Sequence, residues 1–320
     1  MKRSLALLLA LALLLPLAAC RKGPIGPTRP HETTTVTRTE QAQALPAMAD
    51  LLANWAWGTS NGMGEEPVAT HLAIIGYPKG CDFGKLDLAI GPFGQAKVKY
   101  AGEKRGDGSE QWYYPEYDAV TGPYFSFAQP TAVLAWESLF LVDSSALGAG
   151  LAHLQSKYDH ESYAYPPVST ADIAIAETLH PGRGLMETQL LAAADDGSRI
   201  CVFHYENTPD EGLFTIAYIR GGTVLAHDIA TDNIGDDDIA YWRADAEGDD
   251  ICLLEPVLLC RTREGVLLIV SWSAPEGRAE LILREAGGAL EDFTLSNRVY
   301  YYSPWDDSFW LDEYTEEDER

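Results

Sequence analysis

Residues 190–203 read Leu-Leu-Ala-Ala-Ala-Asp-Asp-Gly-Ser-Arg-Ile-Cys-Val-Phe, which is two apolar runs on either side of an acidic turn that ends in glycine. Short apolar runs around such a turn are typical of a β-hairpin. The same order returns further along the chain, where Arg263-Glu264-Gly265 separates Leu258–Cys260 from Leu268–Ser271. These two stretches decide the expected fold, which is antiparallel β-structure.

A second hairpin follows each copy, with Gly221-Gly222 in the first turn and Gly287-Gly288 in the second. The sequence therefore predicts a four-strand meander that occurs twice, over residues 186–230 and 254–298. Two such units fit successive propeller-like blades or the halves of a sandwich, and the sequence leaves both open. The predicted fold class is mainly β, built from antiparallel meanders.

Two further elements are expected before the meanders. Pro46 suits a first helical turn, apolar residues recur at helical spacing up to Trp55, and Gly58 follows, so residues 46–57 are predicted to form a short amphipathic helix. Strict alternation on both sides of Gly91-Pro92-Phe93-Gly94 predicts a β-hairpin with one wet face. The folded, β-rich body is expected to span residues 45–315, followed by an acidic tail at 316–320.

Composition narrows the function. The chain has 320 residues, of which 46% are hydrophobic, and a formal net charge of −25. The apolar content is that of a globular protein, so wholesale disorder is excluded. A chain this acidic repels phosphate backbones, which excludes a role built on binding nucleic acid.

The N-terminus has the pattern of a targeting signal. Lys2 and Arg3 precede an apolar run from Leu5 to Leu15, which as a helix is about 16 Å long and therefore too short to span a bilayer. Small residues then lead directly to a cysteine, as Leu17-Ala18-Ala19-Cys20. This ending resembles the lipobox of bacterial lipoprotein precursors.

The resemblance implies that residues 1–19 are a signal peptide, removed before Cys20, and that Cys20 is then acylated, with palmitate or a similar chain. The bilayer is thus an expected partner through Cys20, and the protein is expected on the extracytoplasmic face of a membrane. Several acyl chains give an anchoring that one chain does not. Residues 20–44, rich in proline and threonine, are expected to be a disordered tether that spaces the body about 25–30 Å from the lipid.

Candidate catalytic groups are few. The spacing Gly58-x-Ser60-x-Gly62 matches a hydrolase nucleophile elbow, which needs a strand before the serine and a helix after it. Here a helix is expected before it, so Ser60 is interpreted as part of a turn. His153 and His160 could share a helical face but lack the spacing of a metal motif. No catalytic residue and no cofactor is predicted. The sequence favours a protein that is not an enzyme, without deciding the point.

Acidic residues and cysteines leave alternatives open. An acidic insertion makes four carboxylates weak candidates for calcium, because hard cations prefer oxygen ligands. These candidates are Asp232, Asp236, Asp238 and Asp245. Without Cys20, four cysteines remain, which form either disulfides or buried thiols outside the cytoplasm. They are Cys81, Cys201, Cys252 and Cys260.

Three functions are compatible with these features. The leading one is a lipid-anchored, non-catalytic binding module of the cell envelope, with a glycan or protein as ligand. Aromatic residues beside acids at 112–114, 163–165 and 300–310 would suit sugar stacking. The alternatives are an envelope glycan hydrolase that uses paired carboxylates, and an accessory factor that docks another envelope protein during assembly.

Mass spectrometry of the native protein tests the predicted cleavage and acylation at Cys20. We expect a mature chain that begins at Cys20 and carries the added mass of its acyl chains. An unmodified Cys20 thiol, or a chain that still begins at Met1, would contradict the lipoprotein prediction.

Overall fold

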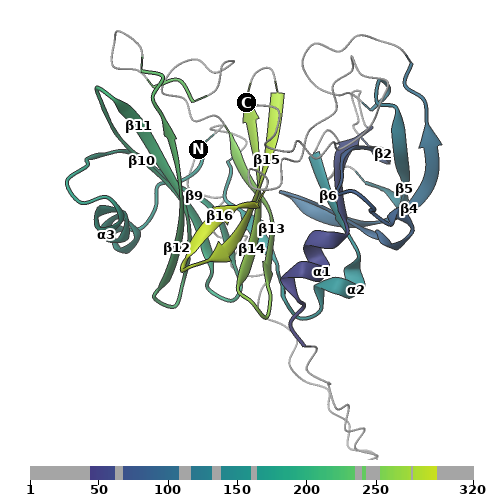
Figure 1. The fold of residues 1–320 in the computed structure, drawn as a ribbon, viewed down its shortest axis with the longest axis horizontal. Helices are drawn as coiled ribbons and strands as arrows, with labels where there is room; N and C mark the ends of the chain where they lie inside the picture. Colours follow the sequence, from purple (N-terminus) through teal and green to yellow (C-terminus); the bar gives the residue numbers. More distant parts are fainter. Residues whose placement is uncertain are drawn as a thin grey trace, which may run out of the picture. The chain divides into compact units, whose positions relative to one another are not determined.

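The computed structural model describes residues 44–61, 68–107, 117–131, 138–159, 164–234, 240–242, 253–274 and 277–293. All of them belong to one compact unit, Ala42–Arg320. Cys20, residues 20–43 of the predicted tether and the predicted acidic tail lie outside the described residues. Within them the protein is mainly antiparallel β-sheet, which confirms the predicted fold class (Figure 1). No helix among the described residues is long and apolar enough to cross a bilayer.

Six strands close into a barrel, a feature that the sequence did not predict. They are β1 (Trp55–Ser60), β2 (Ala69–Gly76), β3 (Leu88–Gly91), β4 (Gly94–Lys104), β5 (Gly122–Thr131) and β6 (Ser138–Val142), arranged in the order β1-β2-β5-β4-β3-β6. The pairing of Gly91 with Gly94 confirms the predicted β3–β4 hairpin. Val98 of β4 is buried while Lys97 and Lys99 are exposed, as expected for a strand with one wet face.

The helix predicted over residues 46–57 is wrong in its extent. Helix α1 covers only Met48–Ala53, and both tryptophans after it lie in β1. Trp55 pairs with Val142 of β6 and its ring stacks on Phe140 at 5.3 Å between centroids. Trp55 fits the helical period that begins at Met48 and also a period of two with Trp57, and pairing of β1 with β6 and β2 decides for the strand. Their predicted role as core residues is confirmed by exposures of 2% and 3%.

Two five-stranded sheets make up the rest. The outer sheet has the order β12-β11-β10-β9-β8, and the central sheet has the order β16-β15-β14-β13-β7. Their strands are β7 (Leu151–Ala152), β8 (Leu154–Ser156), β9 (Leu185–Ala194), β10 (Arg199–Thr208), β11 (Glu211–Arg220), β12 (Thr223–Thr231), β13 (Leu254–Arg261), β14 (Val266–Ala274), β15 (Gly277–Ala286) and β16 (Ala289–Asp292). Strands β9–β12 and β13–β16 are thus two successive four-strand meanders.

Paired glycines make the tight turns of both meanders. Gly221 and Gly222 have φ angles of 54° and 88°, and Gly287 and Gly288 have 59° and 85°. Two consecutive positive φ angles define the type I′ turn, whose twist matches that of a hairpin. Residues with a Cβ adopt this conformation at a cost, so the glycine pairs specify the two hairpins.

The two sheets face each other across one apolar core. Ile200, Val202 and Phe214 of the outer sheet belong to the same buried cluster as Leu268 and Leu283 of the central sheet. The sheets are also joined along both edges. At one edge the chain passes directly from β7 to β8, and at the other His227 Nδ1 of β12 lies 3.2 Å from the Leu290 carbonyl oxygen of β16.

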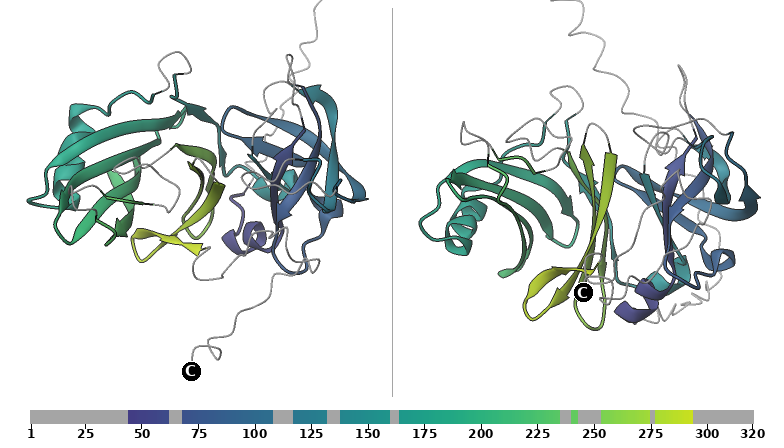
Figure 2. Two further views of the ribbon diagram at one scale, coloured as in Figure 1. Left: turned by 90° about the horizontal axis from the view of Figure 1, so that it is seen from above. Right: turned by 45° about the horizontal axis from the view of Figure 1, so that its top comes forward.

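The central sheet is covered on its second face by the barrel. Residues that alternate with the first set, such as Leu267, Ile269 and Ile282, cluster with Trp57 and Phe140 of the barrel. Helix α3 (Thr170–Leu179) covers the remaining face of the outer sheet, where its Ala176 packs in a cluster with residues of β10 and β11 (Figures 1 and 2). Helix α2 (Ser144–Leu147) is a single turn after β6.

The cysteines that the structure describes are free thiols. Cys201 and Cys260 are buried and Cys81 is half-buried, while Cys252 lies outside the described residues. Burial raises the pKa of each of these three thiols to about 12, so they stay protonated at neutral pH. For these three, the buried-thiol alternative applies.

A core substitution tests the importance of the central sheet. Ile269 is 0% exposed and faces the barrel, so we expect Ile269→Ala to lower the free energy of unfolding by about 2–5 kcal/mol through the cavity it leaves. Val68, which is 40% exposed, provides the control, and Val68→Ala should cost less than about 0.5 kcal/mol. Urea unfolding measures both. Equal effects of the two substitutions would contradict the assignment of Ile269 to a shared core.

Candidate functional site

An open groove lies between α3 and the first half of β9, and has a volume of about 360 Å³. Ile173 and Glu177, one helical turn apart, form its helix wall. Arg183 and residues 185–188 form the opposite side. Met186 is 48% exposed, which makes it the most exposed large apolar side chain in the described part of the chain.

The helix that forms one wall was missed at the sequence level. Ser169 caps α3, since its Oγ accepts a hydrogen bond from the Asp172 backbone N–H at 3.2 Å and donates to Asp172 Oδ2 at 2.7 Å. A serine followed three residues later by an acid, ahead of an apolar run, is a helix-start signal. This signal at residues 169–172 could have predicted α3.

Asp172 ties the start of α3 to the outer sheet. It is 1% exposed and accepts two hydrogen bonds from Arg199 of β10, at 2.7 and 3.2 Å. Burial on its own would raise the pKa of Asp172, but the hydrogen bonds from Arg199 and Ser169 outweigh it and hold the pKa below its ordinary value. The carboxylate is therefore charged at neutral pH and fixes the helix in place.

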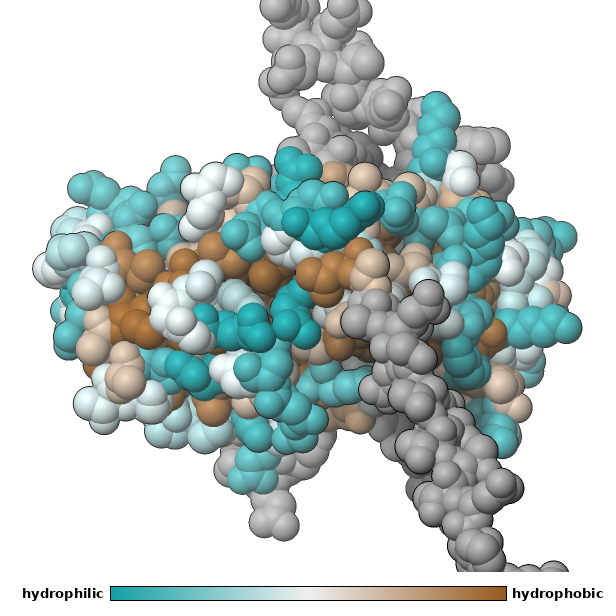
Figure 3. All heavy atoms as spheres, turned by 90° about the horizontal axis from the view of Figure 1, so that it is seen from below, coloured by the Kyte–Doolittle hydropathy of each residue, from teal (hydrophilic) through white to brown (hydrophobic). Residues whose placement is uncertain are grey.

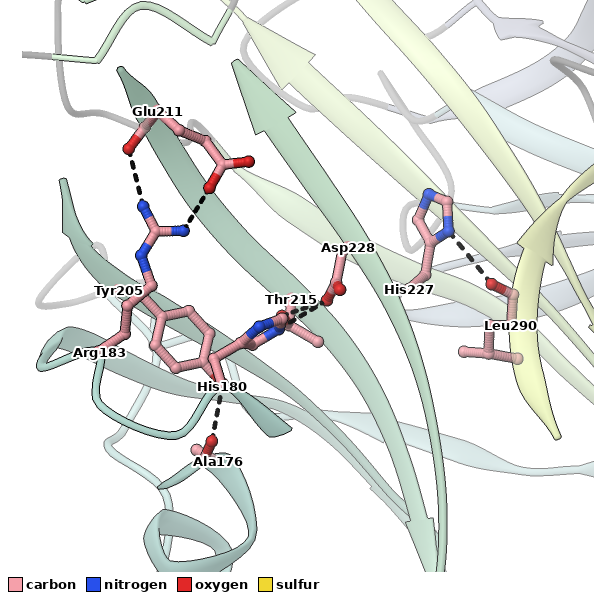
Figure 4. A network of polar contacts seen from close by, with 9 residues as sticks. All are labelled: Ala176, His180, Arg183, Tyr205, Glu211, Thr215, His227, Asp228 and Leu290. Atoms are coloured by element: carbon pink, nitrogen blue, oxygen red, sulfur yellow. Dashed lines mark hydrogen bonds and ion pairs between the residues drawn. The ribbon is translucent and has the colours of Figure 1, made fainter. Parts of the chain in front are cut away.

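A polar network holds the other end of α3 (Figure 4). His180 Nε2 lies 3.1 Å from Asp228 Oδ1, and the Thr215 hydroxyl donates to the same oxygen at 2.6 Å. The Tyr205 hydroxyl donates to the Ala176 carbonyl oxygen at 3.0 Å. Burial raises the pKa of Tyr205 to about 12, which keeps this donor protonated.

The connection from α3 to β9 is fixed by two further contacts. The Arg183 guanidinium donates to Glu211 Oε2 at 2.7 Å and to the Glu211 carbonyl oxygen at 2.8 Å (Figure 4). At Gly184 a Cβ atom would lie 2.4 Å from the Glu206 carboxylate, so a larger residue would displace that acid. The groove thus has a wall that is held at both ends.

The network is suited to positioning rather than to nucleophilic chemistry. Its hydroxyl groups belong to Thr215 and Tyr205, which are both 0% exposed and donate to Asp228 and to the Ala176 carbonyl oxygen. A nucleophile must reach a substrate carbonyl, and both hydroxyls lie beneath the surface. The network holds α3 and its connection to β9 in place, and so keeps the groove beside them rigid.

A second candidate is a row of buried polar residues on the central sheet. Glu255, Ser271 and Glu280 lie side by side on β13, β14 and β15, with exposures of 3%, 0% and 5%. The Ser271 hydroxyl donates to Glu280 Oε1 at 3.4 Å. Neighbouring strands are about 4.8 Å apart, and β14 lies between β13 and β15. The Cα atoms of the two glutamates are therefore about 10 Å apart. This is the one carboxylate pair within a single row of buried residues in the described part.

A third feature is an apolar hollow of about 520 Å³ beside α1. Met48, Leu52 and Phe293 line it, and the Met48 backbone N–H donates to Glu264 Oε2 at 2.8 Å. Seen from below, apolar residues also reach the surface in a band across the half of the molecule that holds the outer and central sheets (Figure 3). The charged residues that line the hollow are engaged within the protein, Glu264 by Met48, Glu285 by the Val266 backbone N–H at 3.1 Å and Arg284 by Glu291 at 3.7 Å.

The structure describes one of the four calcium candidates. Asp232 follows β12, whereas Asp236, Asp238, Asp245 and Cys20 lie outside the described residues. No three His, Cys, Asp or Glu side chains among the residues described are grouped to hold a metal ion.

None of the remaining candidates that the structure describes lines the groove. Ser60 ends β1 and is 6% exposed, so it lies in a strand and not in the expected turn. His153 separates β7 from β8, and His160 lies outside the described residues. Of the aromatic groups, Tyr165 packs against Tyr158 at 5.2 Å between centroids, and residues 112–114, 163 and 300–310 lie outside the described part.

Comparisons with protein-family models, with curated proteins and with solved structures find no match to this chain.

The charge pair of Asp172 gives a test with a pH signature. We expect Asp172→Asn to lower the free energy of unfolding by about 1–3 kcal/mol at pH 7, because Arg199 then lacks its charged partner. A lowered folded-state pKa stabilises above the unfolded value of about 3.9, and the gain is lost as pH falls through the folded value. The gap between variant and wild type should therefore narrow below about pH 4.

The matched control is Asp195→Asn, a change of the same kind in the exposed turn after β9, which should leave stability nearly unchanged. Thermal unfolding followed across pH measures all three proteins. A gap that is the same at pH 7 and pH 3 would show that the Asp172 charge contributes nothing.

Proposed function

We propose that this chain is a lipoprotein, anchored through acylated Cys20 on the extracytoplasmic side of a membrane, whose body is a non-catalytic binding module of the cell envelope. The lipobox-like ending at residues 17–20 and the tether-like composition of residues 20–44 support the anchor. In this proposal the tether lets the body reach ligands beyond the lipid surface.

The observation that carries the binding role is the groove between α3 and β9. Its walls are held by Asp172–Arg199 at one end and by Arg183–Glu211 at the other. A preformed site binds at a lower entropic cost, because its side chains are ordered before the ligand arrives. An exposed apolar residue, Met186, lies beside charged residues in this groove, as is usual where one protein contacts another.

We infer in addition that the two meanders are the halves of a sandwich rather than propeller-like blades. The inference is supported by the single core that the outer and central sheets share and by their connection along both edges. In this arrangement the outer sheet has one face left for α3, and the groove forms at the border of that face.

The alternative is an envelope glycan hydrolase. The buried row of Glu255, Ser271 and Glu280 favours it, because two carboxylates on one face can act as acid and base or nucleophile. This row faces the barrel, and neither the groove nor the hollow beside α1 is lined by its residues. We therefore place this function second.

A binding panel decides between the two functions. The full-length protein in detergent is mixed with peptides, glycans and cell-wall fragments, and Met186→Lys is compared with Leu45→Lys, which changes another exposed apolar residue. We expect one ligand class to bind, with affinity reduced roughly tenfold by Met186→Lys and unchanged by Leu45→Lys. Turnover of a glycan that is abolished by Glu280→Gln would overturn the binding-module proposal.

A further inference from the structure

Strand β9 leaves half of one edge open within the described part of the chain. Along its full length β9 pairs with β10, but on its other side β8 pairs only with residues 192–194. The last contact before the open half is the Leu190 backbone N–H, which donates to the Pro166 carbonyl oxygen at 2.8 Å. Residues 185–189 have no strand partner on this side among the residues that the structure describes.

Alternate residues of the open half direct their backbone groups away from β10. In an antiparallel pair, alternate residues direct their N–H and C=O groups to the same side of the strand. Since Leu190 points away from β10, Thr188 two residues earlier presents its N–H and C=O in the same direction. Thr188 also lines the groove, so these groups are directed to where a ligand would lie.

The open edge of β9 is long enough for one short added strand. Five residues of open edge correspond to about 17 Å of extended chain. The helix wall, with Ile173 and Glu177, stands beside this edge and can contact alternate side chains of an added strand. A strand edge next to a helix wall provides both backbone hydrogen bonds and side-chain contacts, the two components of recognition by strand addition.

Charge selects the kind of segment. Glu177 and Glu187 line the groove and the Glu206 carboxylate lies against Gly184, while Arg183, the one cation among the lining residues, is engaged by Glu211. Glu187 lies opposite His204, which packs edge-on against Trp242 in the core between the sheets, so Glu177 and Glu187 flank an added strand on its two faces. The excess of negative charge favours a segment that carries lysine or arginine. A second copy of this chain is disfavoured, because each copy has a net charge of −25 and would bring the same acids to the contact.

We propose that the groove binds an extended basic segment of a partner protein, which adds as a strand to the open edge of β9 beneath α3. This proposal rests on the proposed function, since it names the ligand class of the same groove. Backbone hydrogen bonds at Thr188 supply sequence-independent affinity, Met186 and Ile173 contact an apolar side chain, and Glu177 and Glu187 pair with flanking cations.

The test uses the full-length protein and fluorescent five-residue peptides. The first, Lys-Val-Thr-Val-Lys, combines an extended preference with two cations, and Glu-Val-Thr-Val-Glu is its charge-reversed match. Two more versions of the first peptide carry N-methyl groups on residues 2 and 4, or on residues 1, 3 and 5. Each set removes the donors of one edge of the peptide and leaves those of the other edge intact.

We expect the basic peptide to bind at low salt, and the charge-reversed peptide to bind at least tenfold more weakly. One methylated version should lose roughly tenfold in affinity while the other retains it, because an added strand uses one of its edges. Glu187→Lys and Glu177→Lys should each weaken binding about fivefold, whereas Asp195→Lys, which makes the same charge change in a distant turn, should not.

Other results overturn the proposal in distinguishable ways. If peptides bind but both methylated versions bind equally well, or if Glu187→Lys has no more effect than Asp195→Lys, strand addition is wrong while a binding role stands. If no peptide binds but a glycan does, the ligand class is wrong and the binding role stands. If nothing binds and a substrate is turned over, both are wrong.

Discussion

Burial of the central sheet on both faces is the constraint on which the rest of the structure depends. Strand β13 is buried at every position from Leu254 to Cys260, and β14 sends alternate side chains into two different cores. Leu268 and Val270 pack with the outer sheet, and Leu267 and Ile269 pack with the barrel. A sheet that is apolar on both faces is stable only when both faces are covered, so the barrel and the outer sheet each complete the burial of the same strands.

This arrangement determines where a binding surface can form. The outer sheet has one face committed to the central sheet, and its other face is covered by the single helix α3. One ten-residue helix leaves part of that face uncovered, next to the half of β9 that β8 does not reach. The groove is therefore a consequence of the layer order, and the bonds of Asp172 and Arg183 make its walls rigid.

The sequence predicted the β-class, the two hairpin pairs and the β3–β4 hairpin, because glycine turns and alternation are local signals. It did not predict the barrel, because closure depends on pairing β6 with both β1 and β3, across fifty or more residues in each case. Trp55 fits both a helical period and a period of two, and only the partner strands decided between them. The groove was missed with α3, although Ser169 and Asp172 carried a readable helix-start signal, and the open edge of β9 depends on where a short distant strand, β8, ends.

The central claim is that the barrel and the two sheets share a core and therefore open together. Native-state hydrogen exchange, read peptide by peptide on the full-length chain, measures this directly. We predict that backbone amides of β1 and β6 in the barrel and of β13 and β14 in the central sheet exchange with the same opening free energy. Barrel amides that exchange at a clearly lower free energy, while β13 and β14 stay protected, would show an independent barrel and contradict the shared core.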